Sequence, residues 1–195
     1  MLRNDVLHCG GAIVSKKHIV TAAHCVVDLQ SPDTSMFPKN IFDEEFKIVL
    51  GTDSLEKMAN DRSKTFKIQN VTVHEEYKYK EGIRGYYDIA VITLSSEINF
   101  NEYRIQPICL PKTPYCEQAE LNDKVGAILG YADGKKLSIT YMQIPSLERC
   151  NTELKTSKDV QTKREHSFKE GIKETMICAK NDFNNEATCP GDSGE

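Results

Sequence analysis

Three polar residues in this chain are of the types needed for covalent nucleophilic catalysis. His24 lies in the segment TAAHC, Asp88 in YYDIAV and Ser193 in GDSG. A serine hydroxyl is a weak nucleophile until a base removes its proton, and a histidine base must be held in one tautomer by an acid. The order His, Asp, Ser along the chain is one of the known orders for this arrangement. These residues therefore predict acyl transfer through a serine.

Short β-strands would have to position these side chains. Runs of β-branched and aromatic residues are separated by polar or glycine-containing turns, which is typical of an all-β domain. Asp88 stands at the start of a nearly all-apolar run, which we expect to be a buried strand. Residues 65–74 alternate apolar and polar side chains and are expected to form one strand. The predicted strands are residues 11–15, 18–21, 46–50, 65–74, 89–94, 124–129, 138–144 and 176–179.

Helical periodicity is scarce in the sequence. One short helix is expected at residues 146–154, where Ser146 follows Pro145 and is a suitable N-cap. Proline-containing or charged segments predict long connections. These are residues 27–45, residues 156–173 and, as a linker between two β-rich halves, residues 107–123.

Several segments resemble the trypsin/chymotrypsin family of serine proteases. The similar pieces extend over nearly the whole chain and are LHCGGAIVS, IVTAAHC, FKIVLG, VHEEY, YYDIAVITL, IQPICLP, ICAK and CPGDSG. The resemblance implies an all-β, chymotrypsin-like double six-stranded β-barrel whose second barrel is incomplete. The peptidase domain would cover residues 1–195. Its parts would be a first barrel at 1–106, a linker at 107–123 and a partial second barrel at 124–195.

The resemblance also implies a role for each candidate residue. His24 would be the general base and acid, Asp88 would orient it, and Ser193 would attack the scissile carbonyl. The backbone N–H groups of Gly191 and Ser193 would form the oxyanion hole. The base of the specificity pocket would be Ala187, which suggests a neutral pocket rather than one for Arg or Lys.

The family pattern breaks at both ends of the sequence. Eight residues precede Cys9, and none of them resembles the family's activation sequence IVGG. The ammonium group that activation creates would pair with Asp192. Glu195 stands where the family continues with glycine and proline. We therefore expect a chain that is truncated at both ends and inactive by itself.

Seven dispersed cysteines without a C-x-x-C motif indicate disulfides in an oxidising compartment. Asn70 begins the glycosylation sequon Asn-Val-Thr, which agrees with a secreted, extracellular protein. The resemblance implies two bridges, Cys9–Cys25 and Cys150–Cys178. Cys109 resembles the cysteine that ties a pro-region to the catalytic domain in many relatives. Cys116 has no counterpart, and both its pairing with Cys109 and a free thiol stay open.

The composition argues against several classes of partner. The net charge of −4 and the scattered lysines provide no basic surface for nucleic acid or an anionic membrane. No apolar run approaches the ~20 residues that span a bilayer. Some relatives hold calcium, but the spacing of the acidic residues at 56, 61, 75 and 76 does not favour such a site. We expect protein or peptide substrates, no cofactor and no metal.

Two functions fit these observations. A serine-type endopeptidase is favoured, because every residue type of the triad is present. The alternative is a non-catalytic homologue of the family that acts as a binding or regulatory protein. Its usual mark would be a substituted triad residue, and the sequence has none.

Overall fold

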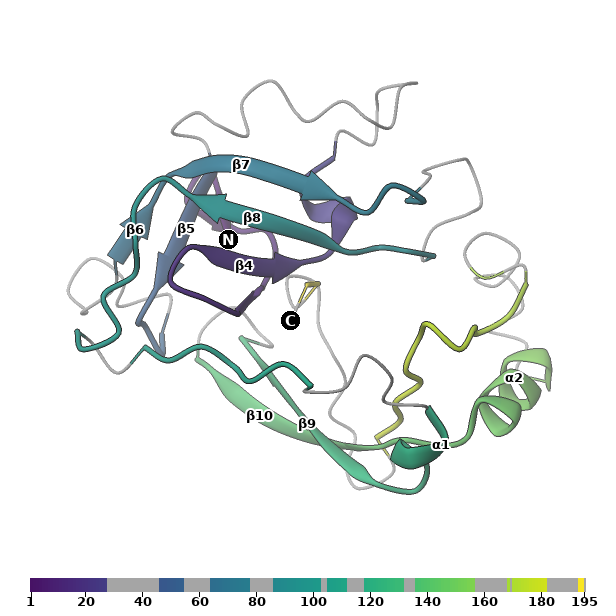
Figure 1. Cartoon of the computed structure of the whole chain (residues 1–195). Coiled ribbons are helices and arrows are strands. Elements are labelled where there is room, and N and C mark those ends of the chain that lie inside the picture. Colours follow the sequence, from purple (N-terminus) through teal and green to yellow (C-terminus); the bar gives the residue numbers. More distant parts are fainter. Residues whose placement is uncertain are drawn as a thin grey trace.

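Figure 1 shows the protein as a computed structural model in which most regular elements are β-strands. The structure describes residues 1–27, 46–54, 64–77, 86–102, 105–111, 118–131, 136–156, 168, 170–181 and 193–194. Of the helices in these ranges, none is long and apolar enough to cross a lipid bilayer.

The first sheet contains four antiparallel strands in the order β2-β1-β5-β6. They are β1 (Leu2–Arg3), β2 (Val6–Leu7), β5 (Phe46–Leu50) and β6 (Lys64–Phe66). The turn between β1 and β2 has φ values of 51° at Asn4 and 61° at Asp5. Positive φ at both central residues suits the twist of a tight hairpin. β1 and β2 were not predicted, because two-residue strands carry no periodicity.

The second sheet contains four antiparallel strands in the order β3-β4-β8-β7. They are β3 (Ala12–Ile13), β4 (His18–Thr21), β7 (Ile68–Val73) and β8 (Ala90–Leu94). The predictions for β4 and the buried strand β8 are confirmed. In β8, every second residue is buried, and the alternate residues are partly buried.

One segment of the chain belongs to both sheets. The prediction of a single strand over 65–74 is wrong, because the strand is interrupted at Lys67. β6 pairs with β5 in the first sheet, whereas β7 pairs with β8 in the second. A register shift between Ile68 and Asn70 then moves the buried positions from Phe66 and Ile68 to Val71. The interrupted strand lets the two sheets enclose one core.

The core lies between these two sheets. Val26, Ile92, Leu94 and Ile98 are at most 2% exposed. Burial of each such side chain contributes roughly 1.5–3 kcal/mol. Phe46 of the first sheet belongs to the same buried cluster, so both sheets form a single packed unit.

The second half of the chain contributes a hairpin and two helices. These elements are α1 (Gln118–Leu121), β9 (Val125–Gly130), β10 (Ser138–Gln143) and α2 (Leu147–Thr156). The β9–β10 pair lies apart from the two four-stranded sheets in Figure 1. The hydroxyl of Tyr131 donates a hydrogen bond of 2.6 Å to the carbonyl of Thr52 and so ties the two halves together.

The expected elements of this half are borne out in part. The helix at 146–154 is confirmed as α2, and the Ser146 hydroxyl accepts a hydrogen bond from the Arg149 N–H. Helix α1 lies inside the segment that was predicted to be a linker. No strand forms at 176–179, because regular pairing there is limited to an isolated bridge between Gln143 and Lys180.

Candidate active site

The register of the second sheet brings His24 and Asp88 together. Thr21 at the end of β4 pairs with Ala90 at the start of β8. His24 follows β4 on the 3-10 turn η1 (Ala23–Cys25), and Asp88 lies two residues before β8. Antiparallel strands place the end of one beside the start of the next. Two residues that are 64 positions apart in the chain therefore meet where β4 ends and β8 begins, at one end of the two central strands.

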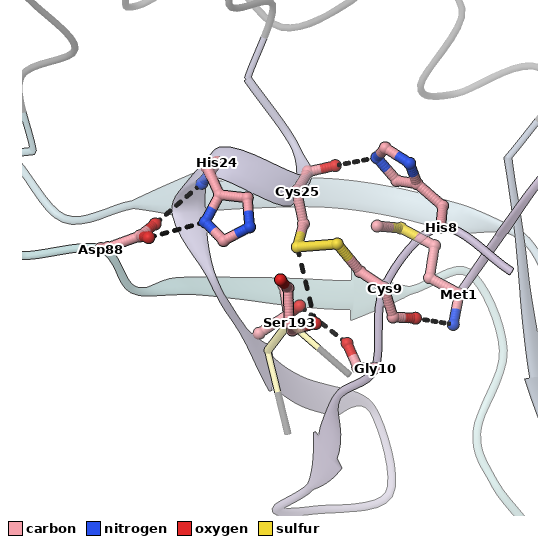
Figure 2. Close-up of a disulfide and its surroundings, with 9 residues drawn as sticks. Met1, His8, Cys9, Gly10, His24, Cys25, Asp88 and Ser193 are labelled. Carbon is pink, nitrogen blue, oxygen red and sulfur yellow. Dashed lines mark hydrogen bonds and ion pairs between the residues drawn. A yellow bond between two sulfur atoms is a disulfide. The ribbon is translucent and has the colours of Figure 1, made fainter. Parts of the chain in front are cut away.

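Asp88 holds His24 through two atoms. The ring Nδ1 of His24 is 2.6 Å from Asp88 Oδ2, and the His24 backbone N–H donates to Asp88 Oδ1 at 2.8 Å. Both contacts are visible in Figure 2. The side chains are 36% exposed for His24 and 22% exposed for Asp88. Because the Asp88 carboxylate is hydrogen-bonded to both the ring and the backbone N–H of His24, the imidazole has a fixed position and orientation.

The electrostatics of this pair determine the tautomer. Burial raises the pKa of Asp88, but hydrogen bonds from the His24 ring, the His24 backbone and the Ala23 backbone outweigh it and hold this pKa below its ordinary value. An ionised carboxylate accepts hydrogen bonds only, so Nδ1 of His24 must carry the proton. The other ring nitrogen, Nε2, then presents a lone pair. This is the state in which a histidine can take a proton from a hydroxyl.

The backbone around Asp88 is a strained turn. The Ile89 N–H donates to the Tyr87 carbonyl at 2.8 Å, so Asp88 is the central residue of a three-residue turn. Tyr87 has a φ of 56°, which costs energy for a bulky side chain. Its ring stacks on His74 with a centroid distance of 4.9 Å. The ring stack and the turn fix the backbone on both sides of Asp88, just before β8 begins. The contact between Tyr87 and His74 was not predicted from the sequence.

Ser193 is held against the first half of the chain. The Gly10 N–H donates to the Ser193 carbonyl at 2.8 Å, and the Thr21 hydroxyl donates to the Gly10 carbonyl at 2.9 Å. The Ser193 carbonyl also lies 3.7 Å from Cys25 Sγ, a van der Waals contact because a disulfide sulfur carries no proton. Figure 2 shows Ser193 below the His24 ring and the disulfide. These contacts of Gly10 and Thr21 were not predicted, because neither residue belongs to a catalytic motif.

Gly194 explains why a glycine follows the serine. Its φ is +94°, in the region that favours glycine. A Cβ at this position would collide with the Thr21 hydroxyl and would lie 2.8 Å from the Gly10 carbonyl oxygen and 3.0 Å from the Ala22 nitrogen. Only a residue without a side chain lets this segment approach β4 so closely.

The structure brings the three predicted triad residues into one region but joins only two of them by a hydrogen bond. Among the described residues, no hydrogen bond links the Ser193 hydroxyl to His24. Catalytic hydrogen bonds are often long or poorly aligned in ligand-free proteins and shorten when substrate binds. The structure therefore has an oriented His24 imidazole with Ser193 in the same region.

The other predicted site residues stand as follows. Gly191, Asp192 and Ala187 lie outside the described residues, so their roles as oxyanion donor, activation-linked acid and pocket base stay predictions. Asn70 is exposed on β7. Its position is accessible to a glycan.

The disulfides have the pairings that the family resemblance implies. Cys9–Cys25 has a Cα–Cα distance of 6.2 Å and lies beside the His24 ring in Figure 2. Cys150–Cys178 has a Cα–Cα distance of 6.5 Å and ties α2 to the segment that follows it. Cys109 is exposed and forms no disulfide within the part of the chain that the structure describes. Cys116 and Cys189 lie outside that part.

The arrangement of the strands matches the chymotrypsin-like β-barrel fold. The family model described as Trypsin matches residues 2–195. This chain therefore belongs to the trypsin family.

Individual relatives agree with this assignment. The clotting factor G beta subunit of Tachypleus tridentatus is 29% identical over 194 residues, which are 95% of this chain and 55% of the relative. Coagulation factor IX of Oryctolagus cuniculus is 29% identical over 192 residues, which are 95% of this chain and 58% of the relative. The chain thus spans little more than half the length of these two proteins.

A solved structure shows the same fold. Neuropsin, described as a serine protease expressed in the limbic system of mouse brain, aligns with a TM-score of 0.69 at 21% identity. The alignment covers 99% of this chain and 72% of the neuropsin chain. At this identity the similarity concerns the fold alone.

Proposed function

We propose that this domain is a serine-type endopeptidase that cleaves peptide bonds through an acyl-enzyme, with His24, Asp88 and Ser193 as its triad. The observation that carries the proposal is the contact of 2.6 Å between His24 Nδ1 and Asp88 Oδ2. Together with the lowered pKa of Asp88, this contact leaves the lone pair of Nε2 available on the side of Ser193.

Each residue then has a defined part in the reaction. His24 Nε2 takes the hydroxyl proton of Ser193 as the oxygen attacks the scissile carbonyl. Asp88 stabilises the imidazolium ion that forms and remains ionised. His24 next gives the proton to the leaving amine, and water repeats the sequence to release the acid. The N–H groups of Gly191 and Ser193 would stabilise the oxyanion, and each such donor typically changes the rate by ~10²–10³.

The substrates are proteins or peptides, and we propose that the domain acts outside the cell. The two disulfides and the exposed sequon at Asn70 support an oxidising, extracellular setting. A neutral specificity pocket at Ala187 is part of the proposal. So is a disulfide from the exposed Cys109 to a pro-region.

A fluorophosphonate probe tests the proposal, because it reacts with a serine hydroxyl whose base is in place. We expect labelling of Ser193 that is lost in Ser193→Ala and His24→Ala. His18→Ala is the matched control, since His18 is exposed and its ring is hydrogen-bonded to the Ser15 hydroxyl. Intact-protein mass spectrometry gives the extent of labelling.

The outcomes separate the possible functions. Labelling of Ser193 that is unaffected by His24→Ala would contradict the peptidase proposal and favour the non-catalytic homologue. The prediction that these 195 residues alone are inactive is tested by the same experiment. Slow labelling without turnover of peptide substrates would agree with it, whereas stoichiometric labelling of Ser193 would contradict it.

A further inference from the structure

Tyr86, two residues before Asp88, is held by a segment from the second half of the chain. Its hydroxyl donates a hydrogen bond of 2.7 Å to the Gly171 carbonyl and accepts one of 3.0 Å from the Glu170 N–H. The Phe168 ring contacts the tyrosine ring edge-on, with 6.0 Å between the centroids. The ammonium group of the nearby lysine at position 173 lies 4.5 Å from the centre of the tyrosine ring. Edge-to-face aromatic pairs and cation–π contacts are both stabilising, so the whole side chain is anchored.

The segment that holds this tyrosine is itself fixed to helix α2. The side-chain amide of Asn151 donates to the Ile172 carbonyl at 3.1 Å and accepts from the Ile172 N–H at 2.8 Å. Gly171 has a φ of 80°, and a Cβ there would lie 2.5 Å from Asn151 Oδ1, so only glycine allows this approach. The disulfide from Cys150 to Cys178 joins α2 to the same part of the chain, which passes beside α2 in Figure 1. The tyrosine hydroxyl is therefore bound to a surface that is fixed at two points.

Two anchors thus act on the backbone that carries Asp88. The ring of Tyr87 stacks on His74 in the first half of the chain, whereas the hydroxyl of Tyr86 is bound to the second half. Tyr87 has a φ of 56°, a conformation that persists only where its surroundings determine it. Asp88 contacts His24 at 2.6 and 2.8 Å, and such hydrogen bonds weaken steeply when their geometry is distorted. A shift of the Tyr86 backbone would therefore reach His24 through Asp88.

We propose that Tyr86 is a positioning residue of the candidate site, which couples residues 170–173 to the contact between Asp88 and His24. The catalytic consequence of this coupling rests on the proposed endopeptidase function. Misplacement of a catalytic group by an ångström can lower a rate ~10²-fold, even when the cause is remote from the chemistry. The two hydrogen bonds of the Tyr86 hydroxyl thus make the triad depend on a segment of the second half.

Hydrogen exchange of the His24 backbone N–H tests the coupling, because Asp88 Oδ1 accepts this hydrogen. Tyr86→Phe removes both hydrogen bonds of the hydroxyl and keeps the contacts of the ring. We expect the His24 N–H to exchange roughly 5–30-fold faster in this variant, the effect of losing two ordinary hydrogen bonds. The amides of the buried strand β8 report opening of the whole core, and their exchange should change less.

Tyr131→Phe is the matched control. The Tyr131 hydroxyl also joins the two halves, through a hydrogen bond of 2.6 Å to the Thr52 carbonyl, but neither residue is a neighbour of Asp88 in the chain. We expect this variant to leave exchange of the His24 N–H unchanged. An equal increase in both variants would indicate a general loss of stability and would overturn the proposal. So would an unchanged rate in Tyr86→Phe.

A second variant tests the same route from the side of α2, and it also covers the case in which Tyr86→Phe does not fold. Asn151→Ala removes both hydrogen bonds to Ile172 and leaves the tyrosine intact. It should also speed exchange of the His24 N–H. The double variant should exchange within ~2-fold of Tyr86→Phe, because both changes break one chain of contacts. Fully additive effects, or no effect of Asn151→Ala, would contradict the route.

The rate of fluorophosphonate labelling of Ser193 measures the catalytic consequence. Tyr86→Phe should lower the maximal labelling rate constant ~10-fold or more, because the base is misplaced. The probe concentration that gives half of this rate should stay the same, and Tyr131→Phe should change neither constant. A change in that concentration alone would identify Tyr86 as a binding contact and overturn the inference. The exchange measurement does not involve Ser193, so it decides the coupling even where the labelling contradicts the peptidase proposal.

Discussion

Replacement of Asp88 by asparagine tests the central contact of the site. The carboxylate accepts two hydrogen bonds from His24, at 2.6 Å from the ring and 2.8 Å from the backbone. Hydrogen bonds to a charged group contribute about 1.5–3 kcal/mol each, against about 0.5–1.5 for neutral ones. An amide keeps one acceptor oxygen. With both side chains partly exposed, we expect Asp88→Asn to lower the free energy of unfolding by about 1–3 kcal/mol.

The same substitution should move a proton on the histidine. The amide NH₂ would face the ring nitrogen that now donates, so Nδ1 would become an acceptor and Nε2 would carry the proton. Nitrogen NMR of the His24 ring distinguishes these tautomers. Urea unfolding measures the loss of stability.

Asp5→Asn is the matched control for this experiment. Asp5 forms an ion pair of 2.9 Å with Lys47, but its side chain is 65% exposed. Exposed pairs contribute at most about 1 kcal/mol. If Asp88→Asn costs no more than Asp5→Asn, or if the His24 proton remains on Nδ1, the reasoning about the site is wrong.

Three further predictions concern the serine segment, a partly buried histidine and the second disulfide. Gly194→Ala should displace Ser193 from Gly10, because the new Cβ would collide with Thr21, and hydrogen exchange of the Gly10 N–H should become faster. Gly126→Ala is the control and should leave this exchange unchanged, because its Cβ would meet nothing nearer than 3.6 Å. Burial lowers the pKa of His8 from its ordinary 6.5, so the folded state favours the neutral ring. Stability should therefore fall as pH drops from about 6.5 through the folded pKa, and His8→Gln should flatten this part of the urea-unfolding profile. Removal of Cys150–Cys178, which closes 28 residues, should lower the free energy of unfolding by about 3.6 kcal/mol; a loss below about 1 kcal/mol would contradict the loop-entropy argument.

Much of the fold could be predicted where a strand carries a clear pattern. β4 and β5 have the predicted bounds, because β-branched and apolar residues begin there after charged residues, and Gly51 follows β5. The interruption at Lys67 could not be predicted from alternation alone. A strand that bends from one sheet to another keeps its alternating side chains, and only its pairing partners change.

The candidate site was predictable in its residue types but only partly in its supports. His24, Asp88 and Ser193 stand in recognisable motifs. Tyr87 supports the site through backbone strain and ring stacking, and Gly10 through a backbone N–H. Such supports depend on three-dimensional proximity, and a single sequence gives no pattern for them.

The position of Ser193 has a consequence for the order of folding. His24 and Asp88 are 64 residues apart, and Ser193 contacts Cys25 across 168 residues. Contacts between distant positions require long loops to close and tend to form slowly. We therefore expect Ser193 to reach His24 only in the last stage of folding, after the two sheets have formed. Under the proposed triad, a newly made or partly folded chain would then have no reactive serine.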